Sequence, residues 1–240
     1  MNISEYRGVM VFAEQRRGEI QKVAFELLGA GRGIADTLQE PLIAVLAGTH
    51  LTDSQAASLI AHGADRVILV DDPRLGVYMT EPFTKALTAV ITAEKPGIVF
   101  FGATTIGRDL APRVSARLKT GLTADCTALA IDDASRNLLM TRPAFGGNIM
   151  ATIICPEHRP QMSTVRPGVM RRLEADMART GETVRFACKI EAADVNVEII
   201  EEVVQKEEKK NIEDASVLVA GGRGLGNPEN FQSLQNLAEM

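Results

Sequence analysis

The glycine-rich segment near the end of the chain has the residue types of a phosphate contact. Residues 221–226 read Gly-Gly-Arg-Gly-Leu-Gly, and Asn227 and Pro228 follow as the cap and first residue of a predicted helix. Glycines let backbone N–H groups approach an anion, and Arg223 adds a planar two-pronged donor for a diphosphate. The GxGxxG pattern fails because position 227 is Asn, and no Lys-Ser/Thr pair completes a P-loop. An ordinary tight turn explains the same residues.

A second candidate site follows a predicted strand at residues 98–102. Thr104 and Arg108 lie where that strand gives way to a helix. Open α/β sheets bind ligands at the carboxyl ends of their strands, so these side chains are placed to hold a nucleotide or to face a partner. The alternative is structural: Thr105 caps the helix, and the arginine joins an Arg–Asp network on the surface.

A third candidate is Arg142, in the segment Thr-Arg-Pro-Ala-Phe-Gly-Gly-Asn at residues 141–148. We interpret this segment as a rigid loop that presents one arginine between flanking strands. A guanidinium in that place can hydrogen-bond a flavin carbonyl or ring nitrogen and stabilise negative charge on the reduced ring. An ordinary salt bridge is the alternative.

The sequence contains no motif that indicates several other kinds of chemistry. No CxxC or GxSxG motif is present, and neither the histidines nor the cysteines have ligand spacing: His50, His62, His158, Cys126, Cys155 and Cys188. A metal site, a disulfide framework and a catalytic triad are therefore not predicted. Three widely separated cysteines fit a reducing compartment, so we expect a cytoplasmic location.

The composition excludes several classes of partner. The 240 residues are 45% hydrophobic and 24% charged, which suits a soluble chain with a substantial core. Lys plus Arg is 26 against 31 for Asp plus Glu, and only 4% of residues are aromatic, without tryptophan. General nucleic-acid binding needs a basic face or stacking platforms, so it is not expected. No apolar run approaches the ~18 residues of a membrane span, so no membrane insertion is expected.

Strands and helices alternate through the first part of the sequence. Short apolar runs predict strands, and apolar residues three or four apart predict helices between them. The expected strands are residues 8–13, 41–46, 66–70 and 98–102, and the expected helices are residues 20–38, 52–62, 80–94 and 108–118. Strands that are apolar on both faces predict a parallel sheet covered by helices on both sides, which is an α/β fold.

The later part of the sequence has a different pattern. Residues 124–131, 138–141, 148–155 and 161–166 read as strands, which we interpret as β-rich additions to the α/β body. Residues 189–214 hold nine acids and four lysines, and residues 205–211 are expected to be an exposed linker. We therefore expect an N-terminal domain over 1–188, an acidic linker over 189–214 and the start of a second domain over 215–240.

The predicted second domain is a single β-loop-α unit, with a strand at residues 216–220 and a helix up to residue 240. A parallel strand needs a neighbour, and one strand with one helix cannot bury its faces. We therefore expect this unit to dock on a partner, or the sequence to be the front part of a longer protein.

Three segments together resemble the alpha subunit of electron transfer flavoprotein. They are GATTIGRDLAPRVSARLKTGLTADCT at residues 102–127, TRPAFGGNIMATIICPEHRPQMSTVRPGV at 141–169 and VLVAGGRGLG at 217–226. The resemblance implies a heterodimer with a beta subunit and electron transfer with an acyl-CoA dehydrogenase-type flavoenzyme. It also implies a nucleotide-binding-like first domain, of the adenine nucleotide alpha hydrolase type, and a second domain that holds FAD.

The resemblance also assigns residues to FAD. In the family, the arginine of the GGRG loop contacts the FAD, which corresponds to Arg223, and Gly222 and Gly224 shape the loop. The middle segment is most similar to electron-bifurcating members, in which the arginine of the TRP segment, here Arg142, reaches a second flavin in the beta subunit. Family segments that make most of the FAD pocket are missing from this sequence, so we expect a shortened subunit that does not hold FAD well alone.

Two other functions remain open from the residues alone. The alternating β/α start also suits a free-standing adenine-nucleotide-binding module of the universal-stress type, which would bind ATP or AMP by itself. The first domain can also serve purely as a scaffold for heterodimer assembly. In that case, replacement of Arg142 would leave the flavin potentials of the complex unchanged.

Overall fold

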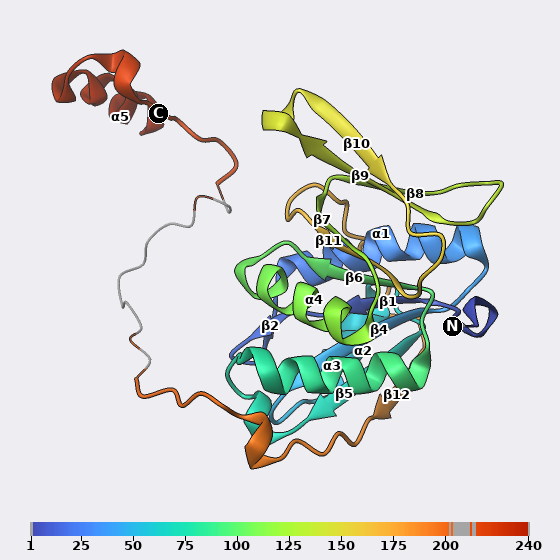
Figure 1. The fold of residues 1–240 in the computed structure, drawn as a ribbon. Coiled ribbons are helices and arrows are strands. Elements are labelled where there is room, and N and C mark those ends of the chain that lie inside the picture. The colour runs from blue at the N-terminus through green and yellow to red at the C-terminus, as the bar shows by residue number, and fades with distance from the viewer. Residues whose placement is uncertain (1, 202, 204–211, 213–214, 240) are drawn as a thin grey trace. The chain divides into compact units, whose positions relative to one another are not determined.

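The chain forms two units that are described separately. The computed structural model describes residues 2–201, 203, 212 and 215–239, without the side chain of residue 145. Contacts divide the chain into a first unit, Met1–Glu198, and a second unit, Ile199–Met240. Figure 1 shows the helices and strands of the first unit gathered around one sheet.

A seven-stranded sheet forms the centre of the first unit. Its strand order is β12-β5-β4-β1-β6-β11-β7, and every neighbouring pair is parallel. The strands are β1 (Val9–Phe12), β4 (Leu42–Gly48), β5 (Arg66–Asp71), β6 (Ile98–Gly102), β7 (Leu122–Cys126), β11 (Gln161–Val165) and β12 (Glu182–Arg185). The predicted parallel α/β fold is confirmed.

Alternate side chains of each central strand enter two separate core layers, because successive side chains of a strand point to opposite faces. Val9 and Val11 of β1 pack with helices α1 (Lys22–Leu38) and α2 (Asp53–Ala61). Met10 and Phe12 pack on the other face with α3 (Thr80–Glu94) and α4 (Thr105–Leu118). Burial on both faces explains why the central strands are almost continuously apolar.

Local signals place the helix ends close to their predicted positions. Thr52 and Gln55 form a capping box at the start of α2. Helix α3 ends at Glu94, and Lys95 adopts the left-handed conformation just before Pro96. Helix α4 begins three residues before its predicted start, at Thr105. Short 3-10 turns are Ile3–Glu5, Pro73–Leu75, Phe145–Gly147 and Ala192–Asp194.

A second, antiparallel sheet has the strand order β10-β9-β8. It consists of β8 (Ala128–Ile131), β9 (Leu138–Ala144) and β10 (Ile149–Ile153), and a short hairpin pairs β2 (Gln15–Arg16) with β3 (Glu19–Ile20). Figure 1 shows β9 and β10 reaching out from the body of the first unit as an arm. Ile149 and Met150 of this arm are 55% and 54% exposed.

Two predictions about the later strands are wrong. Residues 124–131 were expected to form one strand, but β7 lies in the main sheet and β8 in the small one. Residues 161–166 were expected to be a β-rich addition, but β11 is an interior strand between β6 and β7 and is buried throughout. Its polar residues misled the prediction: Gln161 is buried but accepts from the Leu138 N–H at 2.9 Å, and the Thr164 hydroxyl accepts from the Asp125 N–H at 2.8 Å.

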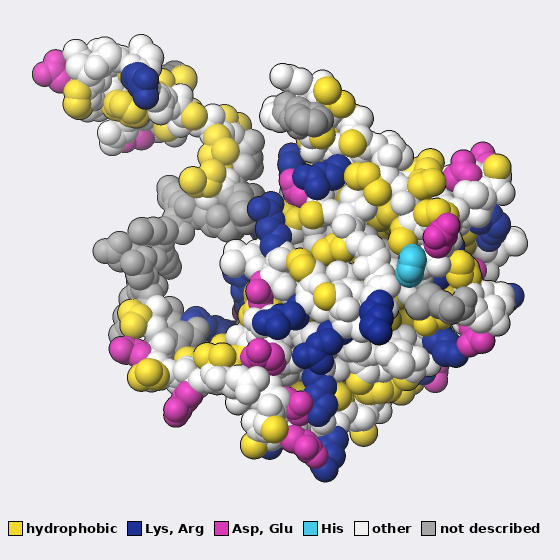
Figure 2. All heavy atoms as spheres, viewed as in Figure 1, with side chains coloured by type: hydrophobic (Ala, Val, Ile, Leu, Met, Phe, Trp, Pro, Cys, Tyr) yellow, Lys and Arg dark blue, Asp and Glu magenta, His cyan; other side chains and the backbone are white. Residues whose placement is uncertain are grey.

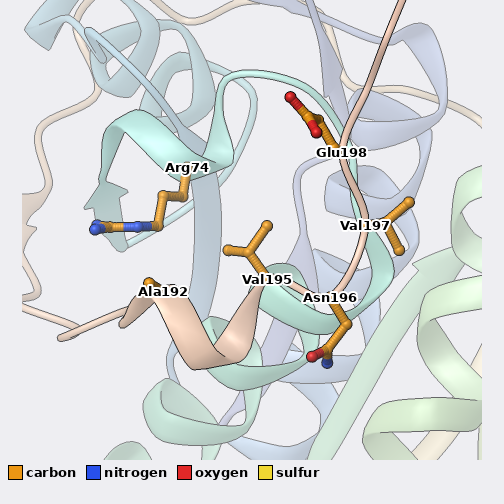
Figure 3. A pocket seen from close by; sticks show the side chains of 6 residues that line it. All are labelled: Arg74, Ala192, Val195, Asn196, Val197 and Glu198. Carbon is orange, nitrogen blue, oxygen red and sulfur yellow. The ribbon is translucent and has the colours of Figure 1, made fainter.

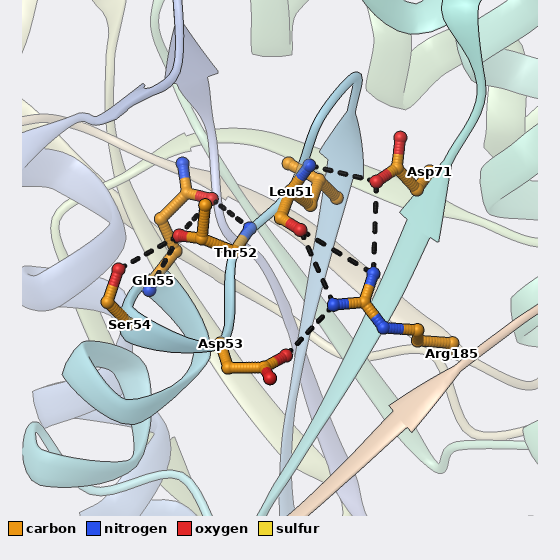
Figure 4. Close-up of polar contacts among 7 residues, drawn as sticks. All are labelled: Leu51, Thr52, Asp53, Ser54, Gln55, Asp71 and Arg185. Atoms are coloured by element: carbon orange, nitrogen blue, oxygen red, sulfur yellow. Dashed lines mark hydrogen bonds and ion pairs between the residues drawn. The ribbon is translucent and has the colours of Figure 1, made fainter.

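The edge strand β12 has a mostly exposed, polar sequence that gives no strand signal. Ion pairs and hydrogen bonds attach its last residue to the loop before α2, as Figure 4 shows. Arg185 lies 2.9 Å from a carboxylate oxygen of Asp53 and donates to the Leu51 carbonyl, and Asp71 accepts from the Leu51 N–H at 2.9 Å. The chain beyond β12 stays on the first unit, since Ile190 is buried and Asp194 pairs with Lys85 at 2.5 Å.

The second unit contains turns and one helix among its described residues. The 3-10 turns Arg223–Leu225 and Pro228–Asn230 precede α5 (Phe231–Ala238). The strand predicted at residues 216–220 is not formed, and Val217 and Leu218 are 82% and 59% exposed. Strand hydrogen bonds require a second strand, and no described residue of this unit supplies one. The linker predicted at 205–211 lies outside the described residues.

Candidate functional site

The carboxyl ends of β1 and β6 meet at the point where the strand order reverses. From β1 the chain moves to β4 and β5 on one side and then to β6 on the other side. Open α/β sheets bind nucleotides in the crevice at such a switch point. Here Glu14 follows β1, and its side chain is 1% exposed. Its carboxylate accepts from the Thr104 hydroxyl and from Arg16 at 3.1 Å. A buried carboxylate in this crevice repels a nucleotide phosphate.

Thr104 holds the beginning of helix α4. Its hydroxyl oxygen accepts the Gly107 N–H at 3.0 Å, so Thr104 is the cap and the prediction of Thr105 was one residue too far. The helix starts against the end of β6, where a Cβ on Gly107 would lie 1.8 Å from the Gly102 carbonyl oxygen. Only glycine fits at that contact, and this close approach fixes the direction in which α4 leaves the sheet.

Arg108 points back to the carboxyl end of the sheet. Its Nε donates to the Ala103 carbonyl at 2.8 Å, and its Nη2 lies 3.6 Å from Asp125. The predicted Arg–Asp network therefore exists, with Asp125 as its acid. The neighbouring Asp109 is engaged elsewhere, because it accepts from the hydroxyls of Tyr78 and Thr80, each at 2.6 Å.

Arg142 lies within strand β9, where its backbone pairs with Ala151 of β10. The prediction of a loop at this position was wrong, because β9 continues through Pro143 to Ala144 before the turn begins. The Arg142 side chain is half-buried, and its charge helps to lower the pKa of Asp125. Within the part of the chain that the structure describes, Arg142 makes no direct hydrogen bond or ion pair.

Asp125 joins these arginines and was not found from the sequence. Strand β7 contains a bulge, since Ala124 and Asp125 together lie opposite Thr164 of β11. Asp125 adopts the left-handed conformation with a φ of 60°, and its N–H donates to the Thr164 hydroxyl at 2.8 Å. Arg166, just after β11, binds both carboxylate oxygens of Asp125 at 3.2 and 2.6 Å. Asp125 lies at the start of one predicted strand and Arg166 at the end of another, and the sheet order makes them neighbours.

The glycine loop of the second unit is a tight turn, as its alternative interpretation expected. Gly226 has a φ of 79°, and Asn227 caps the following turn by accepting from the Asn230 N–H at 3.3 Å. Gly222 and Gly224 have open space where a Cβ would lie, and Arg223 between them is exposed. Arg223 belongs to the second unit and Arg142 to the first.

The rest of the described surface provides weaker candidates for a functional site. An open hollow of about 470 Å³ lies between Arg74 and the segment from Ala192 to Glu198 (Figure 3). Its walls carry one arginine and one glutamate among apolar and amide side chains, which defines no reaction. Among the described residues, no group of His, Cys, Asp and Glu is arranged to hold a metal ion. The described helices include none long and apolar enough to cross a membrane.

The first unit is an α/β domain that combines a parallel sheet, a buried acid at the switch point, an antiparallel arm and arginines at the carboxyl edge of the sheet. The profile of the family described as "Electron transfer flavoprotein domain" matches residues 9–191. The chain belongs to the electron transfer flavoprotein family.

Curated relatives of the chain include a named alpha subunit, a FixB protein and an electron transfer subunit named beta. The chain is 49% identical to "Electron transfer flavoprotein subunit alpha" of Clostridium acetobutylicum, over 100% of this chain and 72% of the relative. It is 49% identical to "Protein FixB" of Clostridium saccharobutylicum, over 100% of this chain and 71% of that protein. It is 42% identical to "Acryloyl-CoA reductase electron transfer subunit beta" of Anaerotignum propionicum, over 93% of this chain and 67% of that relative.

Proposed function

We propose that the chain acts as the alpha subunit of a heterodimeric electron transfer flavoprotein in the cytoplasm. It would pair with a beta subunit and carry electrons through FAD between NADH or an acyl-CoA dehydrogenase-type flavoenzyme and an acceptor. The observation that carries this proposal is the similarity to alpha subunits over the entire chain, at 49% identity. FAD supplies the redox chemistry when bound, and the residues of the chain bind it and set its electrostatic surroundings.

The second unit would contribute contacts to FAD through its glycine loop. Arg223 is exposed, with open space beside Gly222 and Gly224, so a diphosphate can approach the guanidinium and the backbone. These residues fit one side of a dinucleotide and do not enclose it. We further propose that residues 215–240 belong to the FAD-binding part, with 189–214 as the linker from a partner-binding domain over 1–188.

The first unit would contribute Arg142 to a flavin at the subunit interface. Arg142 is half-buried on a strand of the projecting arm and makes no direct polar contact with another described residue. A guanidinium that donates no direct hydrogen bond to a described residue can hydrogen-bond a flavin ring presented by the partner and stabilise negative charge on it.

Coexpression with a beta subunit tests the proposal. The complex should purify as a one-to-one heterodimer with the visible absorbance of a flavin, and Arg223→Gln should reduce the FAD content. Arg185→Gln is the matched control, because Arg185 is also exposed but pairs with Asp53 on the first unit. Failure to form any heterodimer would falsify the subunit assignment. If the heterodimer forms and Arg223→Gln leaves its FAD content unchanged, only the role of the glycine loop would be refuted.

The structure does not favour a free-standing nucleotide-binding module. Glu14 is buried at the switch point and held by Thr104 and Arg16, so an acidic side chain lies in the crevice where open α/β sheets bind nucleotides. Calorimetry of the chain with ATP and AMP should therefore detect no micromolar binding.

A further inference from the structure

The carboxyl edge of the main sheet gathers three arginines around one acid. Arg108 comes from α4, Arg142 from β9 and Arg166 from the residue after β11, while Asp125 stands in the bulge of β7. We call these four residues the Asp125 cluster. Bulges commonly re-aim a side chain beside a functional site. Figure 2 shows Lys and Arg side chains gathered on the visible face of the first unit, below the arm.

The three arginines are held differently by the one carboxylate. Arg166 forks both oxygens at 3.2 and 2.6 Å, and Arg108 reaches Oδ1 at 3.6 Å. Arg142 influences the carboxylate through space only. The hydrogen bond from Arg166, followed by the charges of Arg166, Arg108 and Arg142, lowers the pKa of Asp125 despite its partial burial. Asp125 is therefore ionised at neutral pH. Of the three arginines, Arg142 is the one with which Asp125 forms no direct hydrogen bond or ion pair.

The cluster carries an excess of positive charge. Three guanidinium groups against one carboxylate leave two charges uncompensated. Neighbouring acids are occupied, because Asp109 binds Tyr78 and Thr80, and Glu14 binds Arg16 and Thr104. Like charges repel, so an anionic group beside the three arginines would stabilise the arrangement.

We propose that Asp125 is a positioning residue that holds Arg108 and Arg166 beside Arg142 and thereby sets the positive charge that meets the reduced ring of a flavin. This inference rests on the proposed function and adds Asp125, Arg108 and Arg166 to the site. Asp125 has two effects: its two hydrogen bonds hold the Arg166 side chain in place, and its negative charge lowers the net charge of the cluster by one. The two effects separate experimentally, because asparagine keeps the shape of aspartate and also tolerates the left-handed conformation.

The test measures flavin potentials in the heterodimer. Arg142→Gln first identifies the flavin that the cluster faces, as the one whose midpoint potential it lowers. Asp125→Asn should raise that potential because it adds one net positive charge, and Arg166→Gln should lower it. Arg108→Gln should lower it less, since Arg108 is 62% exposed and screened by water. Arg185→Gln, at the opposite edge of the sheet, should not move it.

The signs of the shifts decide the outcome. If the role of Asp125 is purely structural, Asp125→Asn and Arg166→Gln should shift the midpoint potential in the same direction, because each breaks the same pair of hydrogen bonds. Shifts in the same direction, or no shifts, would overturn the inference. Visible absorbance is measured first on every variant. A wild-type heterodimer without flavin overturns the proposed function, and this inference with it. Opposite shifts that shrink as salt is added support the inference.

Discussion

The two units of this chain differ in what holds their elements in place. In the first unit, strands and helices bury two core layers, and residues such as Phe100 and Leu27 are fully inaccessible to solvent. In the second unit, no described residue is buried, although α5 has the apolar face of an ordinary packed helix. Both units contain good local signals, but the described residues of the second unit form no sheet.

The difference separates local from non-local determinants of structure. Caps and turns need only a few neighbouring residues, so Asn227 caps its turn in the second unit much as Thr52 caps α2 in the first. A strand needs hydrogen bonds from another strand, and residues 216–220 have none among the described residues. The second unit therefore keeps its turns and helix without forming the predicted strand.

Removal of a buried ring should have the largest effect. Phe100→Ala deletes a fully buried side chain of β6 and should lower the free energy of unfolding by about 3–5 kcal/mol. Phe231→Ala deletes the same atoms in α5, where the ring is 46% exposed, and should change it by less than about 1 kcal/mol. Urea unfolding followed by circular dichroism measures both. Equal losses would show that the second unit has a core of its own.

A pair of glycines should show the same contrast in backbone packing. A Cβ on Gly107 would meet the Gly102 carbonyl oxygen at 1.8 Å, so Gly107→Ala should destabilise the chain by roughly 3 kcal/mol despite the better helix propensity of alanine. Gly224→Ala meets open space and should cost no more than about 0.5 kcal/mol. Thermal unfolding compares them. A tolerated Gly107→Ala would mean that α4 can shift away from β6.

The stability of the first unit should decrease at acidic pH. Burial raises the pKa of Asp65, but the Leu42 N–H and the ion pairs with Arg32 and Arg179 outweigh it and hold the pKa below its ordinary value. A depressed pKa contributes stability above the unfolded value of about 3.9, and this stability is lost as pH falls through the folded value. Stability should therefore fall below about pH 4.

Asp65→Asn should remove part of that pH dependence and cost about 1–2 kcal/mol at pH 7. Asp36→Asn is the control, because Asp36 is a more exposed partner of Arg32 alone. Fluorescence of the two tyrosines, which both lie in the first unit, reports its unfolding without a signal from the second. If the stability of Asp65→Asn depended on pH as steeply as that of the wild type, Asp65 would not be the source of the acid sensitivity.

Loss of a helix cap should have the smallest effect on global stability. It should also show the clearest local difference between α5 and α2. Asn227→Ala removes the acceptor for the Asn230 N–H and should weaken the start of the terminal helix by about 1 kcal/mol. Thr52→Ala removes a similar cap, but α2 is also held by its buried face. Hydrogen exchange should therefore speed up through α5 and only near Gln55 in α2. A response confined to the first turn in both helices would contradict the contrast.

The sequence predicts the first half of the fold closely, because its signals are local. The bounds predicted for α3 and β6 agree with the structure, since helical periodicity, Pro96 and a short apolar run mark them directly. The candidate site is predicted only in pieces. Thr104, Arg108 and Arg142 were singled out, whereas Asp125 and Arg166 were not, because their role depends on a bulge and on which strands are neighbours.

The amino-acid sequence by itself determined the alternation of strands and helices, the caps and turns, and the resemblance to a flavoprotein subunit. The tertiary structure decided that β7 and β11 extend the main sheet and that a buried Glu14 lies at the switch point. It also decided that one aspartate gathers three arginines at the carboxyl edge. The physical reason is that periodicity and capping act within a few residues, whereas strand order and charge clusters depend on groups far apart in the chain.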